Sequence, residues 1–170
     1  MAILTPDHFF EQAEKLAAAP QAGAPRQVDL RRAISSAYYG IFHFVSAELA
    51  DEVVGSSKRN TPHYGLVYRS INHQPLKDIC NDLAKQTPPQ RYVPYLPNGG
   101  IGPSIQAFAT ALVELQEKRH RADYNPTARF RTRDALLAVT TGRRAIARFS
   151  NASKTRRSTF LLMLLCPPRT

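Results

Sequence analysis

The chain of 170 residues is poor in cysteine and tryptophan, and it contains no long hydrophobic run. Cys80 and Cys166 are its only cysteines, too few for a disulfide framework and too far apart for a CxxC pair. The longest uninterrupted apolar run, 160–166, has seven residues, whereas a membrane-spanning helix needs about 20. Asp7 and Glu11 precede any apolar run, so neither a signal peptide nor a membrane anchor is expected. The sequence therefore predicts a cytoplasmic protein without a membrane span, a metal site or a cofactor.

The composition is that of a folded protein. Hydrophobic residues make up 43% of the chain and charged residues 21%, which is close to the globular average and unlike a disordered segment. A chain of this length is typical of one domain with its own core. We predict a helical bundle over residues 1–150, followed at 151–170 by a tail that is first basic and then apolar.

Positive charge is concentrated in the last third of the chain. Residues 1–117 contain 10 Lys or Arg and 11 Asp or Glu, whereas residues 118–170 contain 13 and 2. Such asymmetry favours an anionic partner, with nucleic acid first and an acidic protein or a membrane surface second. A merely solvated basic surface is the alternative interpretation.

Helical signals recur along the chain. Apolar residues repeat at three- and four-residue steps, Thr-Pro and Pro-rich breaks separate the segments, and no stretch alternates with a period of two. These patterns predict an all-α fold, an up-and-down bundle of five to six helices. The first two expected helices cover 6–19 and 29–53, the next three begin near 62, 75 and 104, and the last ends near 150.

Two segments do not fit a regular bundle. Between 87 and 103 the chain has five prolines and three glycines, and we expect an irregular loop there. The apolar end of the tail must be buried against the domain, a dimer partner or a membrane surface. Burial in a homodimer is the first interpretation. The roles of the loop and of residues 160–166 stay open.

The last helix of the predicted bundle has two different faces. At 100° per residue, small and apolar residues such as Ala138, Ala145 and Phe149 share one side. The opposite side carries arginines, which we interpret as a phosphate-binding surface or, alternatively, as a solvated face. The arginines of this side are Arg129, Arg133, Arg143, Arg144 and Arg148.

Three segments in order resemble one known family. They are RRAISSAYYGIFHFVSAEL at 31–49, TPHYGLVYRSI at 61–71 and ELQEKRHRADYNP at 114–126. Together they resemble the small stand-alone branch of the HEPN proteins, over roughly residues 5–150. The resemblance implies an up-and-down helical bundle, frequent dimerisation and a role near nucleic acid. Many members of that family are metal-independent RNases or toxins paired with a small nucleotidyltransferase-like antitoxin.

The catalytic motif that this resemblance implies is missing. In active members an arginine is followed, after four to six intervening residues, by a histidine that moves a ribose proton while the arginine neutralises phosphate charge. Arg119 matches that arginine, but Tyr124, Asn125 and Pro126 occupy the histidine positions. We therefore predict no catalytic residue of the family's usual kind.

The remaining motif residues have alternative roles. Arg119 is interpreted either as an internal ion pair with Asp123 or, together with Arg121, as a phosphate ligand. A packed position is expected for Tyr124. His63 is expected to help cap the third helix. The aromatic cluster of the central helix is interpreted as core rather than as a base-stacking surface; its residues are Tyr38, Tyr39, Phe42 and His43.

These observations predict a non-catalytic, HEPN-like binding module that engages RNA, a nucleotide or an acidic partner protein in a toxin-antitoxin or defence setting. One alternative is a divergent metal-independent RNase that uses Arg119 with His120 or His63. The other is a structural partner subunit of a small nucleotidyltransferase. The physiological ligand or partner stays open.

Overall fold

The computed structural model describes residues 4–18 and 23–168 of the chain. Over these residues the protein is all-helical without a strand, which confirms the predicted fold class. The sequence predicts five to six helices, whereas the described residues form seven α-helices and two 3₁₀ segments. These are α1 (Pro6–Ala17), α2 (Gln27–Val53), η1 (Ser56–Lys58), α3 (Pro62–Tyr68), α4 (His73–Leu83), η2 (Gln90–Tyr95), α5 (Pro103–Tyr124), α6 (Thr132–Asn151) and α7 (Lys154–Leu165).

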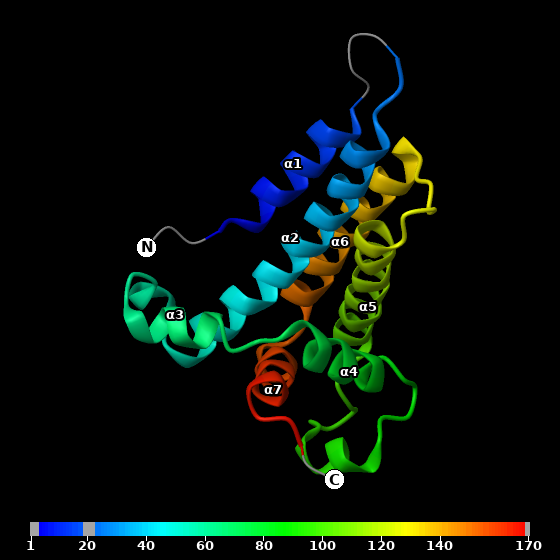
Figure 1. Ribbon diagram of the computed structural model, residues 1–170. Helices are drawn as coiled ribbons and strands as arrows, with labels where there is room; N and C mark the ends of the chain where they lie inside the picture. Colours follow the sequence, from blue (N-terminus) through cyan, green and yellow to red (C-terminus); the bar gives the residue numbers. More distant parts are fainter. Residues whose placement is uncertain (1–3, 19–22, 169–170) are drawn as a thin grey trace.

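The 27-residue helix α2 is the centre of the bundle. It packs against α1, α5 and α6, and its C-terminal part contacts α3 and α7 through Ala47 and Glu52. Figure 1 shows α1, α2, α5 and α6 as a long bundle, with α3, α4 and α7 gathered toward its lower end. A helix with neighbours on several sides must be apolar on several sides, which explains the buried residues all around α2.

Phe10 of α1 determines how closely α1 lies to its neighbours. Its ring is fully buried between Gly40 of α2 and Gly142 of α6. A Cβ atom on Gly40 or Gly142 would lie 2.8 or 2.6 Å from this ring. Glycine at both positions therefore makes room for the phenyl ring.

The connection between α5 and α6 is fixed to the start of α2. The Arg31 guanidinium donates to the carbonyl oxygens of Ala122, Pro126 and Ala128 at 2.7, 3.1 and 2.6 Å. The Gln27 side chain also exchanges two hydrogen bonds with the Phe130 backbone, at 2.7 and 2.9 Å. These bonds hold the connection in one conformation although it has no regular structure.

The proline-rich segment 87–103 is only partly irregular. Its middle forms η2, where Tyr92 is buried and donates a hydrogen bond of 3.3 Å to Asp82 of α4. Short 3₁₀ turns tolerate the prolines that an α-helix excludes. The expectation of a wholly irregular loop is therefore wrong.

The segment predicted as a tail includes a seventh helix. In α7 the Phe160 ring is fully buried, with its centroid 5.7 Å from that of Phe108 and 5.9 Å from that of Phe149. Leu161 and Met163 are buried as well. The apolar residues of this segment thus find most of their burial within their own chain. Among the described helices, none combines the length and apolar composition that crossing a membrane requires.

Candidate functional site

The first candidate site is the exposed side of α6. Arg133, Arg144 and Arg148 are exposed, while Ala138, Ala145 and Phe149 on the opposite side are buried, as the helical wheel predicts. Among the described residues, no carboxylate lies within ion-pair distance of these three arginines. We call Arg133, Arg144 and Arg148 the arginine face.

A groove runs beside the arginine face between α5 and α6. It has a volume of about 420 Å³, and small residues make up most of its lining. Arg144 and Arg148 stand at its edge, and its one carboxylate, Glu114, is 2.6 Å from the Lys118 ammonium. The remaining lining residues are Ala107, Thr110, Ala111, Thr141 and Ala145. The groove therefore offers two unpaired positive charges and hydroxyl groups to a ligand.

Arg143 does not belong to this face in the structure. Its guanidinium lies 3.4 Å from Asp7 and 3.2 Å from Glu14, both on α1, and 5.2 Å from the centroid of the Phe10 ring. Arg143 thus connects α6 to α1.

Arg121 and Arg129 lie near the start of α6. Both are exposed, and the Arg121 guanidinium lies 5.8 Å from the Phe130 ring centroid. Arg131, next to them, is also exposed. These exposed arginines lie at the two ends of the connection between α5 and α6, just before Arg133 in the chain.

Arg119 belongs to a second, half-buried candidate site. Its Nε lies 2.7 Å from the Asp123 carboxylate, so the expected ion pair is present, with side chains 17% and 26% exposed. An Nη atom donates to the Tyr39 hydroxyl at 3.1 Å, and the guanidinium lies 5.7 and 5.5 Å from the ring centroids of Tyr39 and Tyr124. The Ser35 hydroxyl donates to Asp123 at 2.5 Å. Arg119 is thus held by an acid and two aromatic rings.

Two histidines lie beside Arg119. Tyr38 shares a hydrogen bond of 2.6 Å with His73 Nδ1, and His43 Nδ1 shares one of 2.8 Å with the Tyr68 hydroxyl. Both imidazoles pack on Phe42, at centroid distances of 4.1 Å for His73 and 5.5 Å for His43. Burial lowers the pKa of both histidines. The positive charge of Arg119 lowers the pKa of His73 further, and His73 does the same to His43. Both rings are therefore held in their neutral form at neutral pH.

The second candidate site also contains two buried polar atoms without a hydrogen-bond partner, Gln116 Oε1 and Arg119 Nε. The Gln116 side-chain nitrogen donates to the His73 carbonyl oxygen at 3.1 Å, whereas the Gln116 side-chain oxygen has no partner. Arg119 Nε is close to Asp123 but its N–H is poorly aimed, so that contact is an ion pair rather than a hydrogen bond. Such atoms are unusual in a packed interior.

The structure brings some of the predicted motif residues together and leaves others apart. Tyr39 contacts Arg119 directly, and the rings of Tyr38 and His43 both pack near the Tyr39 ring. Tyr124 contacts the Arg119 guanidinium but is 63% exposed rather than packed. His63 is exposed on α3, whose start is capped by the Thr61 hydroxyl, which accepts from the Tyr64 backbone N–H at 3.3 Å.

Sequence reasoning missed His73, Tyr68 and Gln116 as members of this second site. His73 opens α4, Tyr68 ends α3 and Gln116 lies on α5, so no local spacing relates them to the Arg119 motif. Only the packing of four helices brings them together. Among the described residues, no group of three or more potential metal ligands occurs.

Comparison with protein families, curated proteins and solved structures found no match to this chain. The resemblance to the HEPN family therefore stays a prediction from three sequence segments.

Proposed function

We propose that this protein is a non-catalytic binding module that holds single-stranded RNA by its phosphates. The observation that carries the proposal is the arginine face, where Arg133, Arg144 and Arg148 are exposed without an acidic partner among the described residues. Unpaired cations gathered on one side of a helix create a positive potential that attracts anions. The phosphate backbone is the ligand that such a surface attracts most strongly.

The surroundings of the arginine face support this ligand. Arg121 and Arg129 add exposed positive charge at the connection that leads into α6, and the hydroxyls of Thr110 and Thr141 line the groove beside the arginine face. Contacts to phosphate and sugar carry no sequence information, so we expect weak sequence preference. The setting that the HEPN resemblance implies, a toxin-antitoxin pair with a nucleotidyltransferase-like partner, is part of the same proposal.

A binding titration with a labelled single-stranded RNA tests the proposal. The affinity should fall with salt, with a slope of about 0.7 per phosphate contacted in a plot of log K against log salt concentration. The double variant Arg133→Glu and Arg144→Glu should bind at least about tenfold more weakly, with a smaller slope.

The matched control is Lys58→Glu with Arg69→Glu, which changes the net charge equally at the other end of the molecule. The control should retain most of the parent's affinity. Equal loss in both double variants would show that only the net charge matters, and unchanged binding by the first would show that the arginine face is merely solvated.

A second candidate function is RNA cleavage, and one observation favours it. His73 and Arg119 both contact the Tyr39 ring, at 6.1 and 5.7 Å, so a proton-transfer group lies beside a phosphate-stabilising group in one chain. The assay is incubation of the purified protein with a mixed RNA pool without metal. Cleavage that is lost in both His73→Gln and Arg119→Ala, but kept in His120→Ala, would replace the binding proposal with this function.

A further inference from the structure

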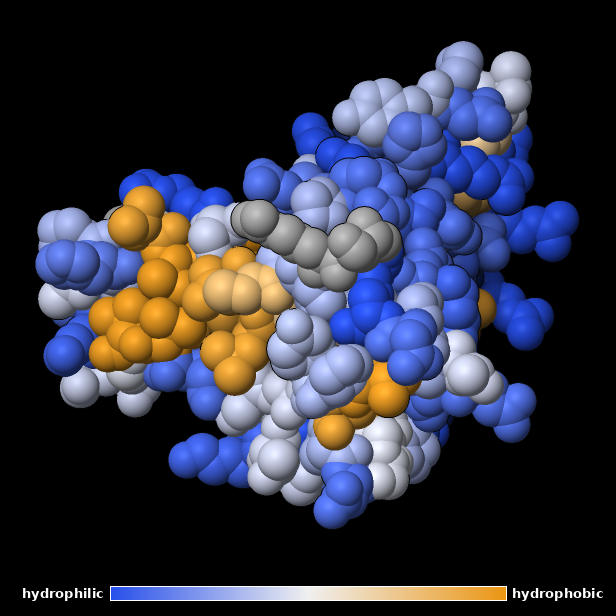
Figure 2. Space-filling view, turned by 90° about the horizontal axis from the view of Figure 1, so that it is seen from below, coloured by the Kyte–Doolittle hydropathy of each residue, from blue (hydrophilic) through white to orange (hydrophobic). Residues whose placement is uncertain are grey.

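Exposed apolar side chains gather at the lower end of the molecule. Figure 2, seen from below, shows a broad hydrophobic area on the side where α3 lies, which extends toward the middle. Its exposed leucines are Leu66 of α3 at 68% and Leu162 of α7 at 53%. The other large ones are Val53 of α2 and, on η2, Val93 and Tyr95. We call these five residues the apolar end surface.

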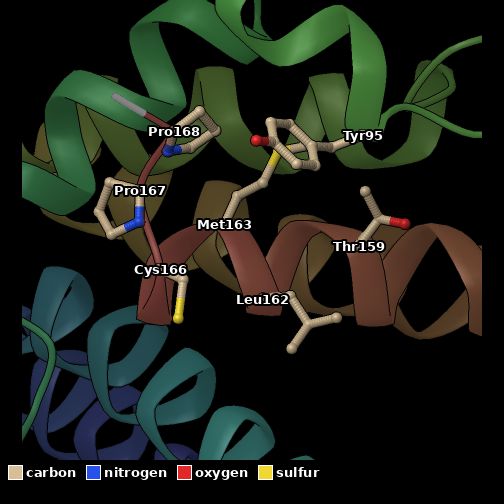
Figure 3. A pocket seen from close by; sticks show the side chains of 7 residues that line it. All are labelled: Tyr95, Thr159, Leu162, Met163, Cys166, Pro167 and Pro168. Atoms are coloured by element: carbon tan, nitrogen blue, oxygen red, sulfur yellow. The ribbon is translucent and has the colours of Figure 1, made fainter. Parts of the chain in front are cut away.

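A pocket of about 530 Å³ opens within this surface. Figure 3 shows Tyr95 of η2 close to Met163 of α7, with Leu162 and Cys166 pointing to the other side of the helix. The remaining lining residues are Thr159, Pro167 and Pro168. Its lining is mostly apolar with a few hydroxyl and thiol groups, so it suits a hydrocarbon chain better than a charged ligand.

Three exposed cations lie on or next to the elements that carry the apolar end surface. Lys58, Arg69 and Lys154 are exposed, and among the described residues none of them forms an ion pair. Three acids lie in the same region, since Glu48, Asp51 and Glu52 line one hollow together with Lys154. Of these, Asp51 pairs with Arg59, and Glu52 accepts a hydrogen bond of 2.6 Å from Ser158. Apolar side chains beside exposed cations are complementary to anionic lipid, whose headgroups attract the cations while its acyl region takes up the apolar groups.

The same charges argue against a second copy of the chain as the occupant. Two copies meeting through this surface would bring their unpaired cations together, and like charges across an interface oppose association. A patch of exposed large apolar residues on a monomer nevertheless needs an occupant or a function. We propose that the apolar end surface binds peripherally to anionic lipid bilayers, with Leu66 and Leu162 entering the acyl region and Lys58, Arg69 and Lys154 at the headgroups.

Vesicle co-sedimentation of the full chain tests this inference. The parent should bind vesicles of mixed phosphatidylglycerol and phosphatidylcholine much better than vesicles of phosphatidylcholine alone. The variant Leu66→Glu with Leu162→Glu should lower the partition coefficient more than about tenfold, because each leucine loses its transfer into hydrocarbon. Both positions are largely exposed, so the variant should fold, which circular dichroism can check.

The matched control is Leu136→Glu with Leu137→Glu, two exposed leucines on α6 that lie outside the apolar end surface. It adds the same negative charge, so purely electrostatic adsorption would be weakened equally in both double variants. Equal weakening would overturn the inference, and so would the absence of binding to anionic vesicles. A parent that sediments as a dimer without binding vesicles, and becomes monomeric in Leu66→Glu with Leu162→Glu, would show that a second copy is the occupant instead.

Discussion

His43 and His73 illustrate how burial controls a single residue's chemistry. Each ring has one nitrogen bonded to a tyrosine hydroxyl and packs against Phe42. Protonation would add a charge to an aromatic cluster whose nearest cation is Arg119, already paired with Asp123. The neutral form is therefore the one that the fold accommodates.

This burial predicts that acid destabilises the fold in a defined range. An unfolded histidine titrates near pH 6.5, and the pKa of both residues is lower in the folded protein. Below about pH 6.5 the unfolded chain thus binds more protons, so the free energy of unfolding should decrease as the pH falls. Urea unfolding measured between pH 7.5 and 5.5 should show this slope.

The control variant is His43→Gln with His73→Gln, in which the slope over the same range should be smaller than in the parent. Burial raises the pKa of Glu48, so protonation of this residue stabilises the fold as the pH falls, opposite to the histidines. This effect grows at lower pH, so the measurements stop at pH 5.5. An identical slope in the parent and the double variant would contradict the assignment to these two histidines.

At the scale of elements, α7 shows how a helix outside the expected bundle becomes part of the core. Its Phe160 ring completes an aromatic group with Phe108 of α5 and Phe149 of α6. The start of α7 is capped by Ser153, whose hydroxyl accepts from the Arg156 backbone N–H. In α7 a polar half, 154–159, is followed by an apolar half, 160–165, and this block pattern hides the helical periodicity, so the sequence suggests a tail.

We predict that Phe160→Ala lowers the free energy of unfolding by about 3–5 kcal/mol, the usual cost of removing a buried phenyl ring and leaving a cavity. Leu162→Ala is the matched change on the same helix, and its cost should stay below about 1 kcal/mol because this side chain is largely exposed. Chemical denaturation of both variants measures the difference. Similar costs at the two positions would show that α7 does not pack into the core as described.

At the scale of the whole molecule, the two proposed surfaces occupy different regions. The arginine face runs along α6 on the side of the long bundle, whereas the apolar end surface lies at the lower end around α3, η2 and α7 (Figure 1). Residues 118–170 contribute cations to both proposed surfaces, with Lys154 on α7 and Arg133 and Arg144 on α6. RNA and lipid can therefore be tested as independent ligands. Homodimerisation stays a prediction from the sequence.

The sequence by itself determined the helical class, the approximate bounds of most helices and the two faces of α6. These properties depend on local periodicity, on capping residues such as Thr61 and on breaks at proline, all of which act within a few residues of one another. The same local spacing correctly predicted the Arg119–Asp123 ion pair. The pairing of Arg143 with α1 was missed, because a helical wheel does not show which neighbour a side meets.

Only the tertiary structure decided the rest. The histidine cluster combines His43 of α2, Tyr68 of α3, His73 of α4 and Arg119 of α5, and the apolar end surface combines residues of four separate elements. The pKa of a histidine and the exposure of a leucine depend on which distant helices pack around it. Packing between helices is long-range in sequence, so no pattern within one segment specifies these sites.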